Sequence, residues 1–571
     1  PAFMAGYPSN TIQDLSIKFF ELAALFLPGV GADKGFKLLV VAAAAAVPWL
    51  AYLAMRTFLG KESDARLAAL AAFLATACWW NSYPREMFYI GMVGFTTLCA
   101  VAPLLLALLY RLVREERPSW RLRLAWVVTV TIFLPLHQLG VVAVGVPATT
   151  LVGWAIARRR WPGLLWAGAG LVVALVVNGP WLAVFLSHLG DNPPLNVAYE
   201  IGMFQSDDPW TFVKDYLGSS FYSTFRTFPM EKGLRCALVA AGVTGIASFA
   251  RRGEKAVAAT LGSGVISMFL LTYFGSLSSL LVWMQPIRFK VMLDAYLALC
   301  ATGAVDGIFA TGRIRRPATY LAPAILGAGL LALIVNLVQT ESSGIMRLRT
   351  TVPPRARLVA EWVASEAPAG GRLLFEESGD ESGFVHEGFY LSSFLPRWTG
   401  REMIGGPANL YLDRHHVAHF SSCRLLNRDI AAFSDDELRA LFRVYNIGAV
   451  IAFHPDSVAR LLAVPGLVTV ARQEGPLTFM KSLQRLGWLA EGEGRVAAGP
   501  NQIRCDHVRG DHVVLKYHWV AGLRATPPAA VEPVRLLADD PIPFIRVNHP
   551  PPEFTVSIGA PPHSGRRLNG S

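Results

Sequence analysis

The sequence predicts a polytopic α-helical membrane protein that continues into a soluble C-terminal region with an α/β part and a β-sandwich part. Three observations support this fold class. Hydrophobic residues make up 53% of the 571 residues and the mean hydropathy is +0.39, which is too apolar for a soluble protein of this length. Successive apolar segments have the length that crosses a bilayer. Short arginine-rich loops alternate with polar or acidic loops between those segments.

Ten segments have the apolar character and length of membrane-spanning helices. We expect them near 36–56, 65–80, 91–112, 123–137, 139–157, 163–187, 233–250, 256–276, 290–310 and 318–338. The stretch 123–157 allows two interpretations, a tight hairpin of two helices or one long region. The predicted number of helices is therefore about ten.

Five of the connecting loops are basic, and this predicts the sidedness of the chain. Their basic residues are Arg56, Lys61 and Arg66; Arg111, Arg114, Arg117, Arg121 and Arg123; Arg158, Arg159 and Arg160; Arg251, Arg252 and Lys255; and Arg313, Arg315 and Arg316. By the positive-inside rule these loops face the cytoplasm. We therefore expect a multi-pass protein of the bacterial cytoplasmic membrane, whose remaining loops and C-terminal region are extracytoplasmic.

The N-terminal residues 1–35 are predicted to be part of an external loop, with an amphipathic helix in the membrane interface at about 15–27. Ten spans and an external C-terminus place Pro1 outside as well. A first helix normally inserts from the cytoplasm, so we expect at least one further helix before this sequence. The transmembrane domain is then 36–338, with a long external loop at 188–232.

After residue 339 the composition becomes polar, with short apolar runs. Helical periodicity at Arg357–Glu366 and Asp435–Tyr445, each followed by a β-rich run, predicts an α/β domain over 339–490. Short strands with proline breaks predict a small β-rich domain, a sandwich, over 491–560. Residues 561–571 are predicted to be a disordered tail. An oxidising compartment would allow Cys423 and Cys505 to pair, although no cysteine spacing requires it.

Several function classes have no support in the sequence. The net charge of +11 comes from residues between apolar segments, without the aromatic-interleaved stripe of a nucleic-acid-binding surface. CxxC, HExxH, Walker A and GxGxxG patterns are absent in a suitable context, so redox, zinc-protease and P-loop chemistry are not indicated.

Polar residues at the outer membrane boundary are the candidate site residues, because such groups are costly there unless they are paired or hydrated. Asp14 is a candidate carboxylate, or simply the N-cap of the interfacial helix. Glu86, next to Arg85, is a candidate general base or metal ligand, or part of a solvated loop end. His137 is a candidate hydrogen-bond donor, or a satisfied interfacial histidine.

Two further groups complete the candidates. Pro286 allows the chain to break as it enters a helix, so Arg288 would lie at the height of the lipid headgroups, where a guanidinium binds phosphate bidentately. Snorkelling of this side chain is the alternative. In the long loop, Asp207, Asp208 and Trp210 combine carboxylates with an aromatic ring, which suits sugar binding or packing of the loop over the membrane domain.

The sequence resembles the GT-C superfamily of polytopic glycosyltransferases, especially bacterial members with a C-terminal extracytoplasmic domain. The matching pieces are Gly6-Tyr7-Pro8, Tyr83 to Gly91 running into Gly94, Pro135 to Gln138, Gln285-Pro286-Ile287-Arg288-Phe289, Arg357 to Glu376 and Arg401 to Gly406. The likeness covers most of the chain, but its motifs are short. It implies inverting transfer of a sugar from a polyprenyl-phosphate donor to an extracytoplasmic glycan, lipid or protein acceptor.

The resemblance also implies roles for the candidate residues. Asp14 and Glu86 would supply the catalytic carboxylate; Arg288, Gln285, His137 and Arg85 would bind the donor phosphate; Tyr7, Tyr83, Asp207, Asp208 and Trp210 would bind sugar or acceptor. The family's acidic residue usually lies in the first external loop, so a carboxylate that precedes this sequence is the alternative to Asp14 and Glu86. A divalent cation, Mg²⁺ or Mn²⁺, is an open expectation. Two other classes stay open: a transporter of lipid-linked intermediates, and a non-catalytic scaffold whose external domain binds glycan or a partner.

Overall fold

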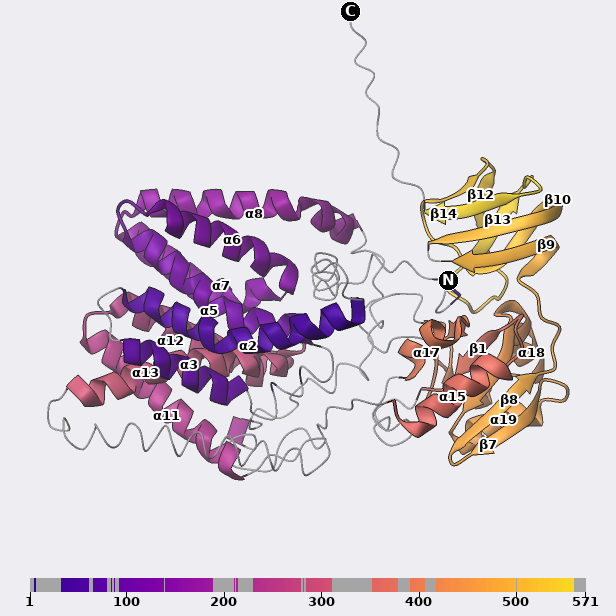
Figure 1. Ribbon diagram of the computed structural model, residues 1–571, viewed down its shortest axis with the longest axis horizontal. Coiled ribbons are helices and arrows are strands. Elements are labelled where there is room, and N and C mark those ends of the chain that lie inside the picture. The colour runs from indigo at the N-terminus through magenta and orange to yellow at the C-terminus, as the bar shows by residue number, and fades with distance from the viewer. Residues whose placement is uncertain are drawn as a thin grey trace, which may run out of the picture. The chain divides into compact units, whose positions relative to one another are not determined.

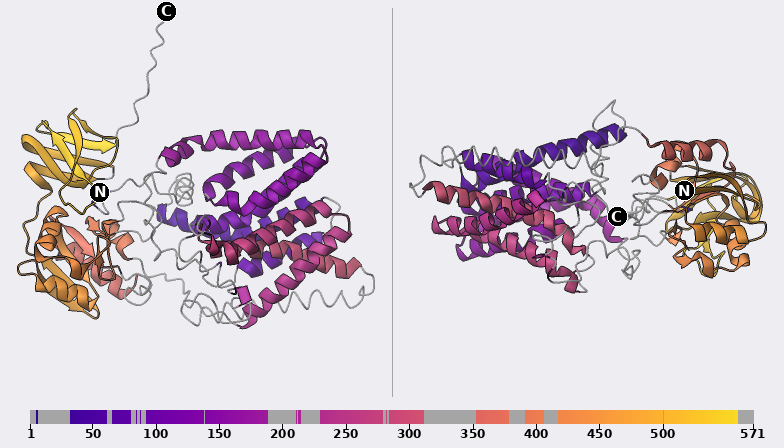
Figure 2. Two further views of the ribbon diagram at one scale, coloured as in Figure 1. Left: turned by 180° about the vertical axis from the view of Figure 1, so that it is seen from behind. Right: turned by 90° about the horizontal axis from the view of Figure 1, so that it is seen from below.

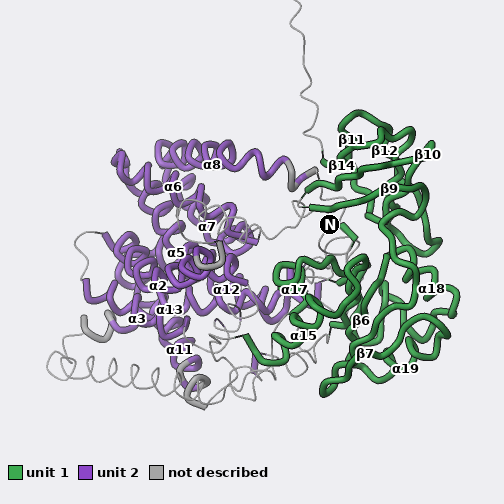
Figure 3. Tube along the Cα trace, turned by 45° about the vertical axis from the view of Figure 1, so that its right-hand side comes forward, with its two compact units in different colours: residues 1–12, 188–194, 349–571 green, residues 13–187, 195–348 purple. Residues whose placement is uncertain are grey.

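The chain divides into two compact units. The structure is a computed structural model that describes residues 5–6, 32–60, 65–79, 84, 87, 92–137, 139–187, 210, 212–213, 229–278, 281, 284–310, 352–377, 391–405, 417–499 and 501–558. One unit contains Gln13–Ser187 and Leu195–Leu348, and the other contains Pro1–Ile12, His188–Pro194 and Arg349–Ser571 (Figure 3). We call them the helical unit and the soluble unit.

The helical unit is built from long apolar helices (Figures 1 and 2). In the described residues they are α2 (Ala32–Leu59), α3 (Ala65–Trp79), α5 (Val93–Arg114), α6 (Trp120–Leu136), α7 (Gly140–Ala157), α8 (Trp161–Ser187), α11 (Pro229–Arg251), α12 (Lys255–Phe274) and α13 (Lys290–Ala310). Each coincides with a segment predicted from the sequence, whereas the predicted segment 318–338 lies outside the described residues.

Five helices of the described part are long and apolar enough to cross a membrane: Gly35–Leu59, Val93–Arg114, Gly140–Ala157, Trp161–Ala183 and Lys255–Leu277. The total of about ten spans stays a prediction. The helix surfaces agree with a lipid environment, since on α8 Leu165 and Val176 are 72% and 71% exposed. Such apolar exposure on a long helix is unfavourable in water. By contrast, α5 is buried along most of its length and forms the centre of the unit.

The stretch 123–157 is a tight hairpin, which decides between the two interpretations of the sequence. His137 is extended at the end of α6, and its Nδ1 accepts a hydrogen bond of 3.1 Å from the backbone N of Leu139. Gly140 then begins α7, where an added Cβ would lie 2.6 Å from Cδ1 of Leu98 on α5. A glycine is therefore required for α7 to start so close to α5.

Three of the basic loops, those after α5, α7 and α11, lie at one end of the helical unit. Arg114, at the end of α5, forms an ion pair of 3.2 Å with Glu254, which directly precedes α12. Arg160, directly before α8, forms an ion pair of 3.1 Å with Glu116 in the loop after α5. These three loops, which the positive-inside rule assigns to one face, thus contact one another in the folded chain.

Helices α11 and α13 pack in parallel through glycines. An added Cβ at Gly242 would meet Leu297, and one at Gly245 would meet the backbone of Cys300. Gly303, one turn further along α13, lies against Gly245 and Phe249. Small residues allow helix backbones to approach this closely, as is common between helices in membranes.

The first part of the soluble unit is an α/β fold around a five-stranded sheet in the order β2-β1-β6-β8-β7. Its strands are β1 (Arg372–Phe375), β2 (Met403–Ile404), β6 (Ile447–Ala452), β7 (Val468–Glu474) and β8 (Leu477–Ser482). β1 pairs in parallel with β2 and β6, and β6 and β8 and then β8 and β7 pair antiparallel. β1 and β6 are buried at every position, as expected when helices cover both faces.

The helices of this part are α15 (Pro354–Ser365), α17 (Leu391–Thr399), α18 (Asp435–Val444) and α19 (Pro455–Ala463). Residues of α15 and α17 form a core with Leu373 and Phe375, and residues of α18 and α19 form another with Leu374. Successive residues of β1 therefore point to opposite faces of the sheet. Both predicted helical stretches, 357–366 and 435–445, coincide with helices followed by strands.

The second part of the soluble unit is sheet-rich, as predicted, and its six strands are hydrogen-bonded into one sheet. The sandwich arrangement of this sheet stays a prediction. The strands are β9 (Leu489–Gly499), β10 (Gln502–His518), β11 (Leu523–Thr526), β12 (Ala530–Val534), β13 (Phe544–Asn548) and β14 (Phe554–Ile558). The long strand β10 pairs with β14 through its first residues and with β13 through its last. The sheet therefore forks along β10, which no local sequence pattern indicates.

Arg372 joins the two parts of the soluble unit. This side chain is fully buried, and its guanidinium lies 4.8 Å from the ring of Trp488 and 4.6 Å from that of Tyr517. Its Nε donates a hydrogen bond of 2.9 Å to Glu402, which also accepts one of 2.7 Å from the Tyr517 hydroxyl. The guanidinium of Arg372, at the start of β1, is thus enclosed by Trp488, which directly precedes β9, and by Tyr517 on β10.

The two cysteines of the soluble unit are both free. Cys505 is buried on β10, and Cys423 lies in the turn between β3 (Phe420–Ser421) and β4 (Arg424–Leu425), a hairpin extended by β5 (Arg428–Asp429). The disulfide that the sequence left open is therefore not formed. The boundaries predicted for the individual domains stay predictions.

Candidate functional site

The candidate site lies where α3, α6 and α12 end and α5, α7, α11 and α13 begin, which we call the polar end of the helical unit. Before α13 the chain breaks. Gln285 adopts a left-handed conformation with φ 52°, and Pro286 opens the short 3₁₀ helix η6 (Pro286–Phe289). This turn packs closely against the end of α12, since an added Cβ at Gly275 would lie 2.9 Å from Cβ of Pro286. The break predicted from Pro286 is present.

Arg288 is buried directly after this break, with 7% of the residue exposed. Its guanidinium carbon lies 5.7 Å from the centre of the Phe95 ring, in the first turn of α5. The His137 ring meets the same phenyl ring edge to face, with 5.3 Å between ring centres. Phe95 therefore brings together two residues that lie far apart in the sequence and that we identified separately.

A buried ion pair lies next to this group along the chain. Asp294 is one turn beyond Lys290 on α13, and Oδ2 of this residue lies 3.9 Å from Nη2 of Arg235 near the start of α11. Both side chains are at most 3% exposed. Ionised groups inside a membrane domain are costly, and they usually pair with one another or face a water-filled cavity.

A small cavity of about 20 Å³ borders Asp294, which is room for a single water molecule. Cys78 and Trp79 at the end of α3, Cys99 on α5 and Leu299 on α13 also line it. The polar end therefore contains both buried charge and space for water.

The charged side chains buried at the polar end, among the described residues, are Arg235, Arg288, Lys290 and Asp294. A guanidinium presents its N–H donors in a planar fork that matches the oxygens of phosphate. In a site of low dielectric constant such a charge interacts with an anion far more strongly than it would in water. The arrangement suits the binding of an anionic group such as a phosphate.

Three of the predicted phosphate-binding residues lie at the polar end: Arg288, Gln285 and His137. Trp210 is 65% exposed and lies beside Phe212, whose ring contacts Phe269 and Tyr273 near the end of α12. This part of the long loop therefore packs on the membrane domain. The other candidates lie outside the described residues: Tyr7, Asp14, Tyr83, Arg85, Glu86, Asp207 and Asp208.

Sequence reasoning missed two parts of this site. Phe95 was not a candidate, because a phenylalanine in an apolar helix gives no functional signal. Arg235 and Asp294 were not among the candidates either. Their pairing depends on the parallel packing of α11 and α13, although a charged residue just inside each of two apolar segments is a signal that could have suggested it.

No model of a known protein family matches the chain, and no curated protein matches it. Among solved structures, the chain is similar to the crystal structure of ArnT from Cupriavidus metallidurans bound to undecaprenyl phosphate. The two are 14% identical, the match covers 82% of this chain and 88% of that chain, and the TM-score is 0.47. At this identity and TM-score the similarity assigns neither site residues nor activity, so both must follow from the residues of this chain.

Proposed function

We propose that this protein is an integral membrane glycosyltransferase that moves a sugar from a polyprenyl-phosphate donor to an acceptor on the non-cytoplasmic side of the membrane. The observation that carries the proposal is Arg288. It is buried in η6, directly before α13, beside Phe95 and His137, at the end of the helical unit opposite the described basic loops. The resemblance of the surrounding Gln285–Phe289 run to GT-C enzymes agrees with this function.

In the proposed reaction the acceptor hydroxyl displaces the polyprenyl phosphate at the anomeric carbon. A carboxylate, Asp14 or Glu86, accepts the proton of the acceptor hydroxyl as the new glycosidic bond forms. The bond between the anomeric carbon and the phosphate oxygen breaks, and negative charge grows on the leaving phosphate. Arg288 stabilises that charge. Stabilisation of the charge that develops in the transition state is usually the largest single contribution to catalysis. Displacement in one step inverts the configuration at the anomeric carbon.

His137 and Gln285 would support the phosphate. Nδ1 of His137 already accepts a hydrogen bond from the backbone of Leu139, so Nε2 carries the proton of the neutral ring and is the available donor. Arg85 would add a second cation. A divalent cation, Mg²⁺ or Mn²⁺, would serve the same purpose if the carboxylates hold one, and Tyr7, Tyr83, Asp207, Asp208 and Trp210 would contact the sugar or acceptor.

The experiment is transfer of radiolabelled sugar from a panel of polyprenyl-phosphate donors by membranes that contain the protein. We expect Arg288→Ala to lower the transfer rate by about 100-fold or more, as is typical for loss of a group that stabilises transition-state charge. Arg288→Lys should restore part of the rate, because it keeps the charge and loses the planar fork. Arg121→Ala, which removes an exposed arginine in the first turn of α6, is the matched control and should transfer sugar normally.

Full transfer by Arg288→Ala at wild-type expression would reject the proposed site.

A transporter is the second candidate, and the buried Arg235–Asp294 pair beside a cavity is the observation that favours it. In that case no donor would support transfer, while reconstituted vesicles would move a lipid-linked phosphate across the bilayer. A scaffold would show neither activity, and Arg288→Ala would change only its stability.

A further inference from the structure

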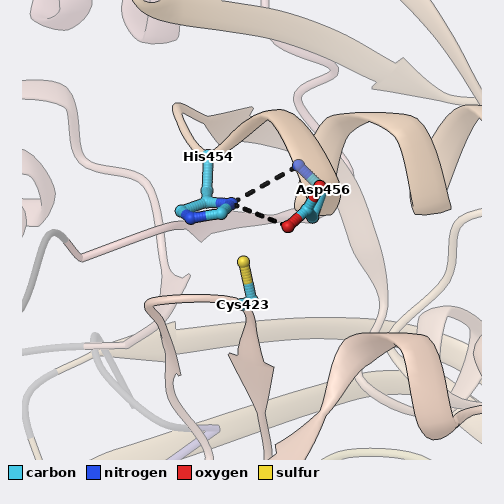
Figure 4. A group of neighbouring side chains, drawn as sticks. All are labelled: Cys423, His454 and Asp456. Carbon is cyan, nitrogen blue, oxygen red and sulfur yellow. Dashed lines mark hydrogen bonds and ion pairs between the residues drawn. The ribbon is translucent and has the colours of Figure 1, made fainter.

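A second group of chemically active side chains lies in the soluble unit. Cys423, His454 and Asp456 place one ligand atom each within 4.8 Å of the others. Figure 4 shows the three side chains directed toward a common space, Cys423 from a hairpin and the other two from the start of α19. His454 follows Cys423 by 31 residues in the sequence, and Asp456 follows His454 by 2. This spacing matches none of the metal-binding motifs considered above.

The location of this group follows from the α/β sheet. β1 and β6 are parallel, so their carboxyl ends meet at one edge, which is where ligands bind in open α/β sheets. His454 and Asp456 follow the end of β6. The β3–β4 hairpin is attached to the chain after β1, because the backbone N of Glu377 donates a hydrogen bond of 2.8 Å to the carbonyl of Phe420.

Glu376 fixes both ligand-bearing segments. This carboxylate is 1% exposed, and its Oε1 accepts hydrogen bonds from the backbone N of Cys423, at 3.1 Å, and from the Ser457 hydroxyl. Its Oε2 accepts from the backbone N of Phe453 and of His454, at 3.0 and 3.1 Å. One buried side chain therefore holds the hairpin turn and the start of α19 at a set separation.

The hairpin turn itself is unusual. Ser422 and Cys423, its two central residues, have φ of 46° and 62°, a conformation that normally requires glycine or asparagine. A cysteine in this conformation costs free energy. Strained backbone of this kind is concentrated at functional sites of proteins. The turn directs the thiol of Cys423 toward His454.

The contacts between His454 and Asp456 are long for hydrogen bonds. Nδ1 of His454 accepts from the backbone N of Asp456 at 3.4 Å, a long contact for a helix cap. The carboxylate of Asp456 lies 3.8 Å from the same ring nitrogen and is 84% exposed.

We propose that Cys423, His454 and Asp456 bind one zinc ion at the carboxyl edge of the α/β sheet, with Glu376 as the residue that positions them. A mixed set of sulfur, nitrogen and oxygen ligands is typical of zinc. In tetrahedral coordination with bonds of roughly 2.0–2.3 Å, ligand atoms are about 3.6 Å apart. The three side chains reach that spacing by small rotations, which the exposure of His454 and Asp456 permits.

Three protein ligands leave one coordination position for water or an added group, as in zinc sites that exchange ligands. The ion would also tie the β3–β4 hairpin to α19, and so stabilise the folded soluble unit by mass action. This inference is independent of the proposed sugar transfer, because it concerns residues of the soluble unit only.

The test uses the full chain, purified in detergent and stripped of metal with a chelator. Titration with ZnCl₂ should show one equivalent bound per chain and a rise in the thermal unfolding temperature. Titration with CoCl₂ should give the absorption band of thiolate-to-cobalt charge transfer. That band should be lost in Cys423→Ser, and His454→Ala and Asp456→Asn should each weaken binding by about tenfold or more.

The chain offers a matched control on β10, where Cys505 precedes an Asp506–His507 pair whose side chains are 2.8 Å apart. Cys505→Ser, Asp506→Asn and His507→Ala should leave the cobalt band and the zinc affinity unchanged. Absence of stoichiometric binding would overturn the proposal, as would a cobalt band that survives in Cys423→Ser or disappears in Cys505→Ser. If Cys423→Ser fails to fold, the exposed Asp456→Asn decides, and unchanged zinc affinity in that variant also overturns it.

Discussion

Replacing Gly245 with alanine tests the packing of α11 against α13, the two helices that bring Arg235, Arg288 and Asp294 to the polar end. An added Cβ at Gly245 would lie 1.8 Å from the carbonyl oxygen of Cys300 and 2.7 Å from its carbonyl carbon. Ordinary contact begins at 3.4 Å, so the helices must move apart by roughly 1.6 Å. Backbone atoms cannot turn aside as the end of a side chain can.

The expected cost is about 3 kcal/mol, the upper end of the range for overpacked interiors. A gap of this width also removes much of the dispersion attraction along the interface. Two other glycines of α11 complete a graded series. At Gly242 the added Cβ would lie 2.7 Å from Cδ2 of Leu297, a mobile side-chain end, so we expect a smaller loss. At Gly233 no atom lies within 4 Å, so alanine should be neutral or stabilise the helix by up to about 1 kcal/mol.

The assay is the temperature at which each purified variant loses its monodisperse peak in detergent by size-exclusion chromatography. Gly245→Ala should lose it at the lowest temperature, Gly242→Ala at an intermediate one, and Gly233→Ala at or above the wild-type value. Transfer activity should fall in the same order, because separation of the helices also separates Arg235 from Asp294. A Gly245→Ala protein as stable as the wild type would refute the parallel packing.

Three further predictions concern the soluble unit, each checked by thermal unfolding of the full chain. Burial raises the pKa of Glu377 to about 7, so ionisation of this carboxyl group destabilises the folded state increasingly from pH 4.5 to 7. Glu377→Gln should therefore be more stable than the wild type at pH 8 and equal to it at pH 4. A stability difference that does not change with pH would contradict this. Hydrogen bonds from Arg428 and Ser434 lower the pKa of Glu437 to about 2, so the ionised carboxylate stabilises the folded state above pH 4.5 and this stabilisation is lost as the pH falls toward 2. Glu437→Gln should therefore be less stable than the wild type at pH 7 and equally stable at pH 2. Arg372→Ala should cost about 3–5 kcal/mol, because it leaves Glu402 without its buried partner, and Arg372→Lys should recover little if ring stacking matters.

The helices of the membrane domain could be predicted well from the sequence. The ends of an apolar run of bilayer length can be located in the sequence from the arginines or prolines that flank it. The helices α5 and α13 accordingly begin and end within two residues of the predicted segments. Pro286 likewise predicted the break before Arg288, because a proline cannot continue a helix and fixes the local backbone.

Contacts between distant segments could not be predicted in this way. Phe95 lies between Arg288 and His137 only because three helices meet there, and nothing near Phe95 in the sequence signals it. The fork of the sheet at β10 depends on which strand pairs with each half of that strand. Cys423 approaches His454 because β1 and β6 are parallel neighbours, and the sequence contains no spacing that expresses this.

The enclosure of Arg372 has a consequence for the order in which the soluble unit can fold. Arg372 is synthesised well before the rings that cover it, Trp488 and Tyr517. Its strand β1 lies between β2 and β6 in the sheet, and both of these strands are synthesised after it. A nascent chain that ends before Trp488 would leave this guanidinium without its cover. The soluble unit therefore cannot be completed segment by segment as it is synthesised, and it reaches its native state only after the forked sheet has been made.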